Sequence, residues 1–478
     1  MTARPPSVHA VLGAAKTAIE GDGEHEGERV RVLVAARGLT RDPEAVLAVA
    51  RAVVADERAR LAAGERPRAL QSLGVEVRGR LAAFDGPPSA GASGPIPVLN
   101  ATGVIVHTNL GRAAWPAAAI EAARLAAAGP VLLEMDRDTG RRGARFTAAE
   151  EHLIALTGAQ AALVVTNNAA AIALAVGLAG RGGGVAVSRG ELVEIGGGVR
   201  IPEILRRAGV RLVEVGTTNR TRVEDFETAL DGASRIRVVL RVHPSNFVQT
   251  GFVEAPDAAA LAVAAHRHDA IVVDDLGSGA LLPTERVGLA HEPTPRERLA
   301  AGADLVTFSG DKLVGGPQAG LIVGRADLVA KLRRDPLARA MRPDKTILAA
   351  VAATLALYRA GRAMEEIPVW RMLATPVAEL RDRAAAIVAS LPDGAGAVVD
   401  LDATVGGGSA PGETIRSSGV TLGAATGRAA TSLMARLRAG EPAVIGRVDR
   451  DRVVLDLRTV HPADDARLLP AIVAALAG

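Results

Sequence analysis

From about residue 98 onward, short apolar runs rich in β-branched residues alternate with alanine-rich stretches of helical periodicity. Such runs predict buried strands, and their alternation with helices predicts a doubly wound, largely parallel α/β sheet. The last run follows Lys312 after only a Gly-Gly-Pro turn, which is too short for a parallel crossover, so we expect an antiparallel strand there. The seven predicted strands are Ala162–Thr166, Val185–Ser188, Arg211–Val215, Ile236–Val242, Ile271–Asp274, Leu305–Ser309 and Leu321–Val323.

The rest of the chain divides by composition. Its first part has apolar residues at helical spacing, and a Gly/Pro/Ser-rich stretch follows that is typical of a linker. After residue 345, two helical stretches, several β-like segments and a closing helix predict a small α+β domain. We therefore expect an N-terminal helical domain, a linker, a core domain and a C-terminal domain at residues 1–83, 84–97, 98–345 and 346–478.

Composition restricts the chemistry. The chain has no Cys, which excludes disulfides, a thiolate nucleophile and Cys-ligated metal sites. Aromatic residues make up 2% and the net charge is +3, so any RNA contact is expected at phosphates and helix shape rather than by base stacking. Because we find neither an apolar run of about 20 residues nor a signal-peptide pattern, we expect a soluble, cytoplasmic protein without membrane contact.

Lysine is rare in this chain. Of 56 basic residues only four are lysines, at Lys16, Lys312, Lys331 and Lys345. A lone lysine is often a solvated surface group. However, Lys312 alone follows a predicted strand, between glycines and an apolar run, and sites in sheets of this type lie at the carboxyl ends of strands. Lys312 is therefore the candidate catalytic amine.

Two other strand ends carry polar residues. Asp274 and Asp275 could bind a metal, a ribose or a pyridinium nitrogen, or cap a helix. Asn167 and Asn168 open a predicted helix, which suits a phosphate but also an ordinary N-cap. Pyridoxal phosphate needs a lysine amine, a carboxylate at its ring nitrogen and a cradle for its phosphate. The three strand ends together favour this cofactor and an aspartate-aminotransferase-like fold (fold type I).

Several longer motifs make the hypothesis more specific. The stretches are Asn100–Arg112, Asn167–Ala171, Ser188–Gly197, Val215–Thr221, Asp275–Gly279 and Ser309–Gly320, with weaker likeness at Val444–Arg447 and Leu455–Arg458. The chain resembles the bacterial L-seryl-tRNA(Sec) selenium transferases, or selenocysteine synthases, in all of them. The resemblance implies that Lys312 forms the Schiff base with pyridoxal phosphate and that Asp275 pairs with the pyridinium, with Asp274 as its neighbour.

The resemblance also implies roles for residues around these two. It places Asn167, Asn168 and Ser309 at the cofactor. It leaves His107 and His243 without an assigned role, and it places Glu191 and Glu194 near the site by motif alone. The residues that it implies for substrate and donor binding are Arg112, Arg339, Arg342, Thr217 and Thr218.

The implied reaction converts seryl-tRNA(Sec) to selenocysteinyl-tRNA(Sec) with selenophosphate, through an aminoacrylyl-tRNA intermediate. The implied assembly is a homo-oligomer, a decamer of five dimers, with the N-terminal domain gripping the tRNA and selenophosphate synthetase as a candidate partner. One alternative is a small-molecule lyase of the same fold, like the aminosugar-acid ammonia lyases, but the helical residues 1–83 favour tRNA. The other is a non-enzymatic tRNA-binding paralogue, which the set Ser309, Lys312 and Asp275 disfavours.

Overall fold

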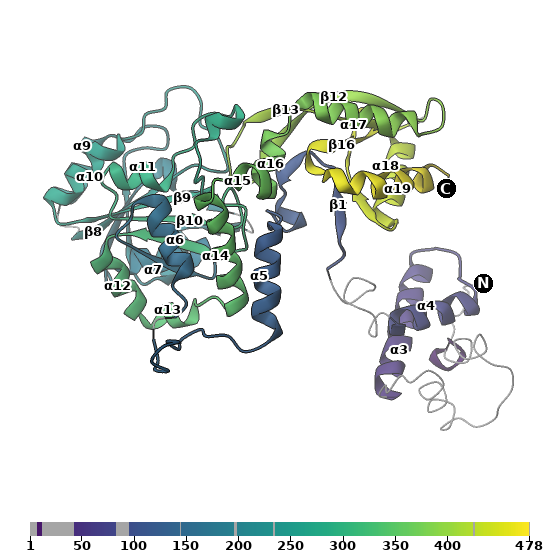
Figure 1. The fold of residues 1–478 in the computed structure, drawn as a ribbon, viewed down its shortest axis with the longest axis horizontal. Coiled ribbons are helices and arrows are strands. Elements are labelled where there is room, and N and C mark those ends of the chain that lie inside the picture. Colours follow the sequence, from purple (N-terminus) through teal and green to yellow (C-terminus); the bar gives the residue numbers. More distant parts are fainter. Residues whose placement is uncertain are drawn as a thin grey trace. The chain divides into compact units, whose positions relative to one another are not determined.

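The computed structural model describes residues 7–11, 43–82, 95–143, 145–195, 198–232, 235–423 and 426–477. The chain forms two compact units, Met1–Val98 and Leu99–Gly478 (Figure 1). Most of the predicted linker, residues 84–94, lies outside the described residues. Among the helices that the structure describes, none has the length and apolar character needed to cross a membrane.

The first unit contains two packed helices, α3 (Pro43–Ala62) and α4 (Leu70–Ala82). Pro43 begins α3, where its missing N–H costs no helical hydrogen bond. The apolar faces of the two helices meet in a small core. The buried members of this core on α3 and α4 are Ala50, Val53, Val54, Leu73 and Val77.

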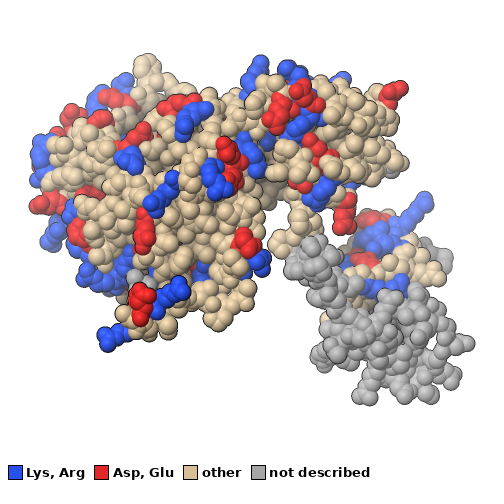
Figure 2. All heavy atoms as spheres, viewed as in Figure 1, with Lys and Arg blue, Asp and Glu red and all other residues tan. Residues whose placement is uncertain are grey.

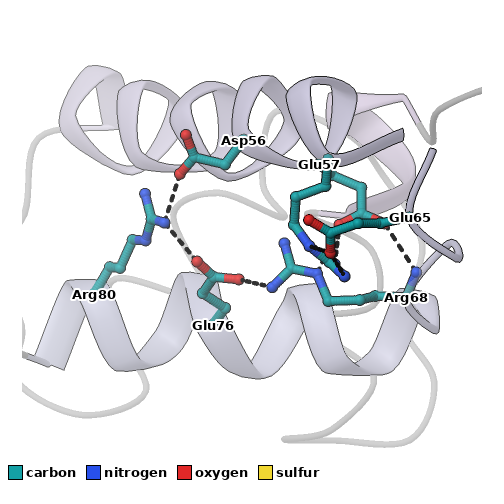
Figure 3. Close-up of polar contacts among 7 residues, drawn as sticks. Asp56, Glu57, Glu65, Arg68, Glu76 and Arg80 are labelled. Atoms are coloured by element: carbon teal, nitrogen blue, oxygen red, sulfur yellow. Dashed lines mark hydrogen bonds and ion pairs between the residues drawn. The ribbon is translucent and has the colours of Figure 1, made fainter. Parts of the chain in front are cut away.

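Ion pairs also link these helices (Figure 3). Glu57 is fully buried and accepts hydrogen bonds from the backbone N–H of Arg68 at 2.8 Å and from its Nε at 2.6 Å. Arg60 adds a third contact to Glu57, at 3.0 Å. At the other end of α4, Arg80 lies 2.6 Å from Asp56 on α3. Several arginines of the unit are therefore engaged within it.

The second unit contains the predicted seven-stranded sheet. All seven predicted strands are confirmed, and β11 is antiparallel to both of its neighbours while the remaining pairs are parallel. In spatial order the strands are β3 (Ala161–Val165), β11 (Gly320–Gly324), β10 (Leu305–Ser309), β9 (Ile271–Gly277), β8 (Ile236–Val242), β4 (Gly184–Ser188) and β7 (Arg211–Val215).

Helices cover both faces of this sheet (Figure 1). Because side chains alternate along a strand, Leu163 and Val165 of β3 join one core while Ala162 and Val164 join the other. The first core includes α7 (Asn168–Gly177), α8 (Ile201–Arg207) and α12 (Ala326–Arg334). Helices on the opposite face are α6 (Ala148–Thr157), α9 (Val223–Asp231), α10 (Ala258–Arg267) and α14 (Lys345–Arg359), with α5 (Ala117–Ala128) packed against α14.

The C-terminal part forms a second sheet of five strands, in the order β15 (Arg447–Asp449), β16 (Arg452–Asp456), β13 (Thr414–Leu422), β12 (Gly396–Gly406) and β2 (Val104–Val106). Strand β2 pairs in parallel with β12. The segment just after residue 98, which we expected within the core domain, therefore supplies a strand to the C-terminal sheet. This sheet packs with α17 (Val377–Ala389), α18 (Gly427–Ala439) and α19 (Asp465–Ala477).

Shorter elements connect these layers. They are β1 (Val98–Asn100), β14 (Ala443–Ile445), β5 (Glu194–Ile195), β6 (Val199–Arg200), α11 (Pro295–Ala300), α13 (Pro336–Ala340), α15 (Ala363–Glu366) and α16 (Pro368–Ala374). Figure 2 shows acidic and basic side chains interspersed over the visible face of the second unit.

Candidate active site

A cavity of about 370 Å³ opens at the carboxyl edge of the seven-stranded sheet. Residues that end or follow four of its strands line this cavity: Asn168 after β3, His243 after β8, Asp275 in β9 and Ser309 in β10. Lys312 completes the set from the turn after β10. The strand ends that the sequence singled out therefore meet in one place, as expected for a parallel α/β sheet.

Lys312 is almost entirely buried, with 9% of its surface exposed. Burial lowers the pKa of its amine, although the nearby Asp275 carboxylate opposes this shift. A glycine run of the C-terminal part closes over the amine, because a Cβ on Gly408 would lie 2.6 Å from Lys312 Nζ. A buried amine with a lowered pKa is more readily unprotonated and nucleophilic at neutral pH.

Asp275 is held in place from two sides. Its Oδ1 accepts hydrogen bonds from Asn168 Nδ2 at 2.8 Å and from Thr307 Oγ1 at 3.0 Å. Burial raises the pKa of Asp275, and these two hydrogen bonds oppose that shift. A positive group in the cavity beside this carboxylate would favour its ionised form.

The two asparagines after β3 act differently. Asn167 is the N-cap of α7, and its side chain accepts a hydrogen bond from the Ala170 N–H at 2.9 Å. Asn168 orients Asp275, and its own Oδ1 is buried without a hydrogen-bond partner. Both residues line the cavity at the start of α7, where helix N–H groups and the helix dipole favour an anion.

Arg112 and Asp311 form an ion pair at the cavity wall, with 2.7 Å between Nη1 and Oδ2. Arg112 is the one substrate-binding arginine of the resemblance that lines the Lys312 cavity. Arg339 and Arg342 are exposed outside its lining, and Arg342 lies 3.7 Å from Glu134.

The predicted threonine pair also lies outside this lining. Thr218 lines a neighbouring cavity of about 290 Å³, whereas Thr217 hydrogen-bonds to the Arg220 carbonyl at 2.9 Å. His243 and Glu292 line that second cavity as well.

The acids that lacked a specific role have distinct surroundings. Asp274 lies within 3.8 Å of Arg241 and 3.5 Å of Arg298 rather than at the Lys312 cavity. Burial raises the pKa of Glu191 to about 7. Glu194 is exposed and pairs with Arg200 at 2.8 Å. His107 has a buried Nδ1 without a hydrogen-bond partner.

Some lining residues were not identified as site residues from the sequence. They are Thr108, Ser245, Asn246, Asp311, Gln318, Gly407 and Gly408. Asp311 and Gln318 lie inside the quoted Lys312 motif, and the run Gly406–Gly408 was a visible signal of close backbone approach. Thr108 lies inside the quoted motif Asn100–Arg112. Ser245 and Asn246 carried no local signal, because segments far apart in sequence bring them to the cavity.

Solved structures include one of similar fold. D-Glucosaminate-6-phosphate ammonia-lyase matches with a TM-score of 0.57 and 23% identity, over 79% of this chain and 95% of that chain. With the sheet order above, the predicted aspartate-aminotransferase-like fold of type I is confirmed.

Sequence relatives are closer. The L-seryl-tRNA(Sec) selenium transferase of Rhizobium meliloti (strain 1021) is 45% identical over 383 residues, which cover 79% of this chain and 81% of that protein. The enzyme of the same name from Moorella thermoacetica is 46% identical over 395 residues, covering 81% and 83%. Residues 98–461 match the family described as L-seryl-tRNA selenium transferase. The chain belongs to the L-seryl-tRNA selenium transferase family.

Proposed function

We propose that this chain converts seryl-tRNA(Sec) to selenocysteinyl-tRNA(Sec) with bound pyridoxal phosphate and with selenophosphate as the selenium donor. The observation that carries the proposal is the buried Lys312 amine opposite a fixed Asp275 carboxylate, in a member of this family. The direct test is conversion of seryl-tRNA(Sec) by the purified protein, with selenophosphate supplied and with Lys312→Ala as the inactive control.

The residues present fit pyridoxal phosphate. Lys312 offers the amine, Asp275 the carboxylate for the pyridine nitrogen, and the start of α7 at Asn167 and Asn168 an anion site. The buried, unpaired Oδ1 of Asn168 fits a cavity that a polar ligand completes. When bound, the cofactor supplies an electron sink that makes the serine α-proton acidic.

In this proposal Lys312 removes the α-proton of the seryl group. Its lowered pKa leaves the amine free to accept a proton, and burial excludes water from it. Asp275 stays fixed through Asn168 and Thr307, so that the carboxylate faces the ligand in one orientation. Ser309 lines the cavity beside the same strand end.

We assign binding of the donor anion to Arg112, Arg339 and Arg342. A small, highly charged anion suits bidentate guanidinium groups. Arg112 is the one already at the Lys312 cavity, and Asp311 holds it there at 2.7 Å. We place Thr217 and Thr218 on the substrate side, where Thr218 lines the adjoining cavity.

We assign tRNA binding to the N-terminal unit. Arg51 and Arg58 of α3 are exposed and have no ion-pair partner among the residues that the structure describes. They are therefore available to phosphates, whereas Arg60, Arg68 and Arg80 are engaged in the network of Figure 3. Four further arginines that favour RNA binding, Arg29, Arg31, Arg37 and Arg41, lie outside the described residues.

We also propose a homo-oligomer, the decamer of five dimers that the resemblance implies, with selenophosphate synthetase as a donor-delivering partner. Exposed apolar side chains on the second unit, including Phe252 at 82% and Leu125 at 57% exposure, support burial against other copies. A cytoplasmic location follows from an aminoacyl-tRNA substrate.

A further inference from the structure

His243 forms part of the wall between two cavities. It lines the Lys312 cavity of about 370 Å³ and also the adjoining cavity of about 290 Å³. Its backbone N–H donates to the Asp275 carbonyl at 2.8 Å, so the residue is fixed at the strand edge that carries the proposed catalytic groups. His243 therefore borders both the Lys312 cavity and the adjoining cavity.

A buried carboxylate lies against this ring. Glu292 Oε2 is 3.2 Å from His243 Nε2 and accepts a hydrogen bond from Ser278 Oγ at 2.9 Å, and Glu292 is only 5% exposed. Burial by itself would raise the pKa of Glu292, but its contacts with His243 and Ser278 lower it below the ordinary value. An ionised Glu292 attracts the Nε2–H group and so fixes the orientation of the ring, as a carboxylate does behind a catalytic histidine.

The proposed reaction requires a second proton transfer besides the one assigned to Lys312. The seryl hydroxyl is a poor leaving group unless its oxygen is protonated as the bond breaks. The Nδ1 atom of His243 has no hydrogen-bond partner among the described residues, since the side-chain contact of this ring is through Nε2. Because Nε2 faces Glu292, Nδ1 is the atom that can donate to a ligand.

We propose that His243 is the acid that protonates the departing serine hydroxyl, and that Glu292 is the residue that positions it. The Cβ–O bond breaks, the oxygen keeps the bonding electron pair, and it takes the Nδ1 proton to leave as water. His243 becomes neutral with its remaining proton on Nε2, and Nδ1 regains a proton from solvent after the product water has left. This inference rests on the proposed function and identifies the acid for the step in which the seryl group loses water.

The test changes the leaving group. The holoenzyme and its His243→Gln variant are given seryl-tRNA(Sec) and the same tRNA carrying β-chloroalanine, whose chloride departs without a proton. Single-turnover elimination from the seryl substrate should slow about 100-fold or more in the variant. Elimination from the chloroalanyl substrate should remain at the wild-type rate, and the visible absorbance of the bound cofactor should be unchanged. Glu292→Gln should show the same pattern with a smaller loss.

The matched control is His291→Gln, which changes a half-exposed histidine paired with surface carboxylates Glu285 and Glu297. It should leave both substrates at the wild-type rate. Equal slowing on both substrates in His243→Gln and Glu292→Gln, or no slowing on the seryl substrate, would overturn the inference. If His243→Gln loses the cofactor, the rates of Glu292→Gln on the seryl and chloroalanyl substrates test the inference instead. Failure of the wild type to convert seryl-tRNA(Sec) would instead reject the proposed function.

Discussion

Arg112 Nη1 lies 2.7 Å from Asp311 Oδ2, so the residue next to Lys312 in sequence holds the arginine at the wall of the Lys312 cavity. Asp311 is nearly buried, with 7% of its side chain exposed, whereas Arg112 retains 30%. The guanidinium therefore has free donors on its exposed side while Asp311 fixes its position. A donor anion can bind to these free donors next to the reacting amine.

Replacing Arg112 with alanine should weaken use of the donor. Loss of a charge-assisted contact costs about 1.5–3 kcal/mol, which corresponds to a KM for selenophosphate raised roughly 10- to 100-fold. The visible absorbance of the cofactor should not change. Arg124→Ala is the control, because Arg124 is exposed on α5 and pairs with Glu121, away from the Lys312 cavity. Wild-type KM values in the Arg112, Arg339 and Arg342 variants alike would contradict the assigned donor site.

Glu57→Gln should destabilise the first unit. The change removes the charge of a buried carboxylate that meets Arg60 and Arg68, at a cost of about 1–3 kcal/mol. The lost stability would be measured as faster amide hydrogen exchange within α3 and α4. Glu65→Gln is the matched control, because Glu65 is half exposed and forms an ion pair with Arg60, so its loss should cost under about 1 kcal/mol. Equal effects from both changes would argue against a stabilising role for burial.

The same carboxyl predicts a pH dependence. The hydrogen bond from the Arg68 backbone, supported by the Arg68 and Arg60 guanidinium groups and opposed by burial, lowers the pKa of Glu57. The unfolded chain restores the ordinary value of about 4.3. Glu57 therefore contributes stability that is fully present above that pH and is lost as pH falls through the lower folded-state pKa. After correction for the pH dependence of intrinsic amide exchange, the protection of amides in α3 and α4 should fall on acidification in the wild type, and less so in Glu57→Gln.

Deleting residues 1–83 should abolish binding of seryl-tRNA(Sec) and leave the cofactor absorbance unchanged. We expect the cofactor to stay bound because the chain forms two compact units and every proposed cofactor residue lies beyond residue 160. In the full-length protein, the affinity should fall steeply with salt, because contacts to phosphates release counterions. Full tRNA affinity in the truncated protein would contradict the assignment of tRNA binding to the N-terminal unit, and with it the reason for preferring tRNA over a small-molecule substrate.

The seven-stranded sheet could be predicted because most of its strands are buried on both faces. Runs such as Ile236–Val242 are mostly apolar, and their spacing left room for a crossover helix everywhere except before β11. The same reasoning identified Lys312 and Asp275 as site residues, since each lies at the end of a predicted strand. Local sequence was sufficient to predict a site residue where that residue lies at a strand end.

The remainder depends on long-range pairing. Nothing in residues 104–106 indicates that they pair with β12, some 300 residues later in the chain. Likewise, Gly408 approaches Lys312 only because the C-terminal part folds back onto the strand edge. The contact between His243 and Glu292 joins two loops 49 positions apart, each with an unremarkable local pattern. Such contacts arise from topology, which short-range periodicity does not encode.

Lys312 is the amine that we propose to bind pyridoxal phosphate, and every other assignment at the cavity depends on it. The most direct measurement is borohydride reduction of the coloured holoenzyme, followed by peptide mapping of the reduced adduct. With only four lysines in the chain, the assignment is unambiguous. Reduction should abolish the visible absorbance and leave a single adduct on Lys312, and no adduct should form in Lys312→Ala. An adduct on Lys16, Lys331 or Lys345, or a visible absorbance that survives Lys312→Ala, would contradict it.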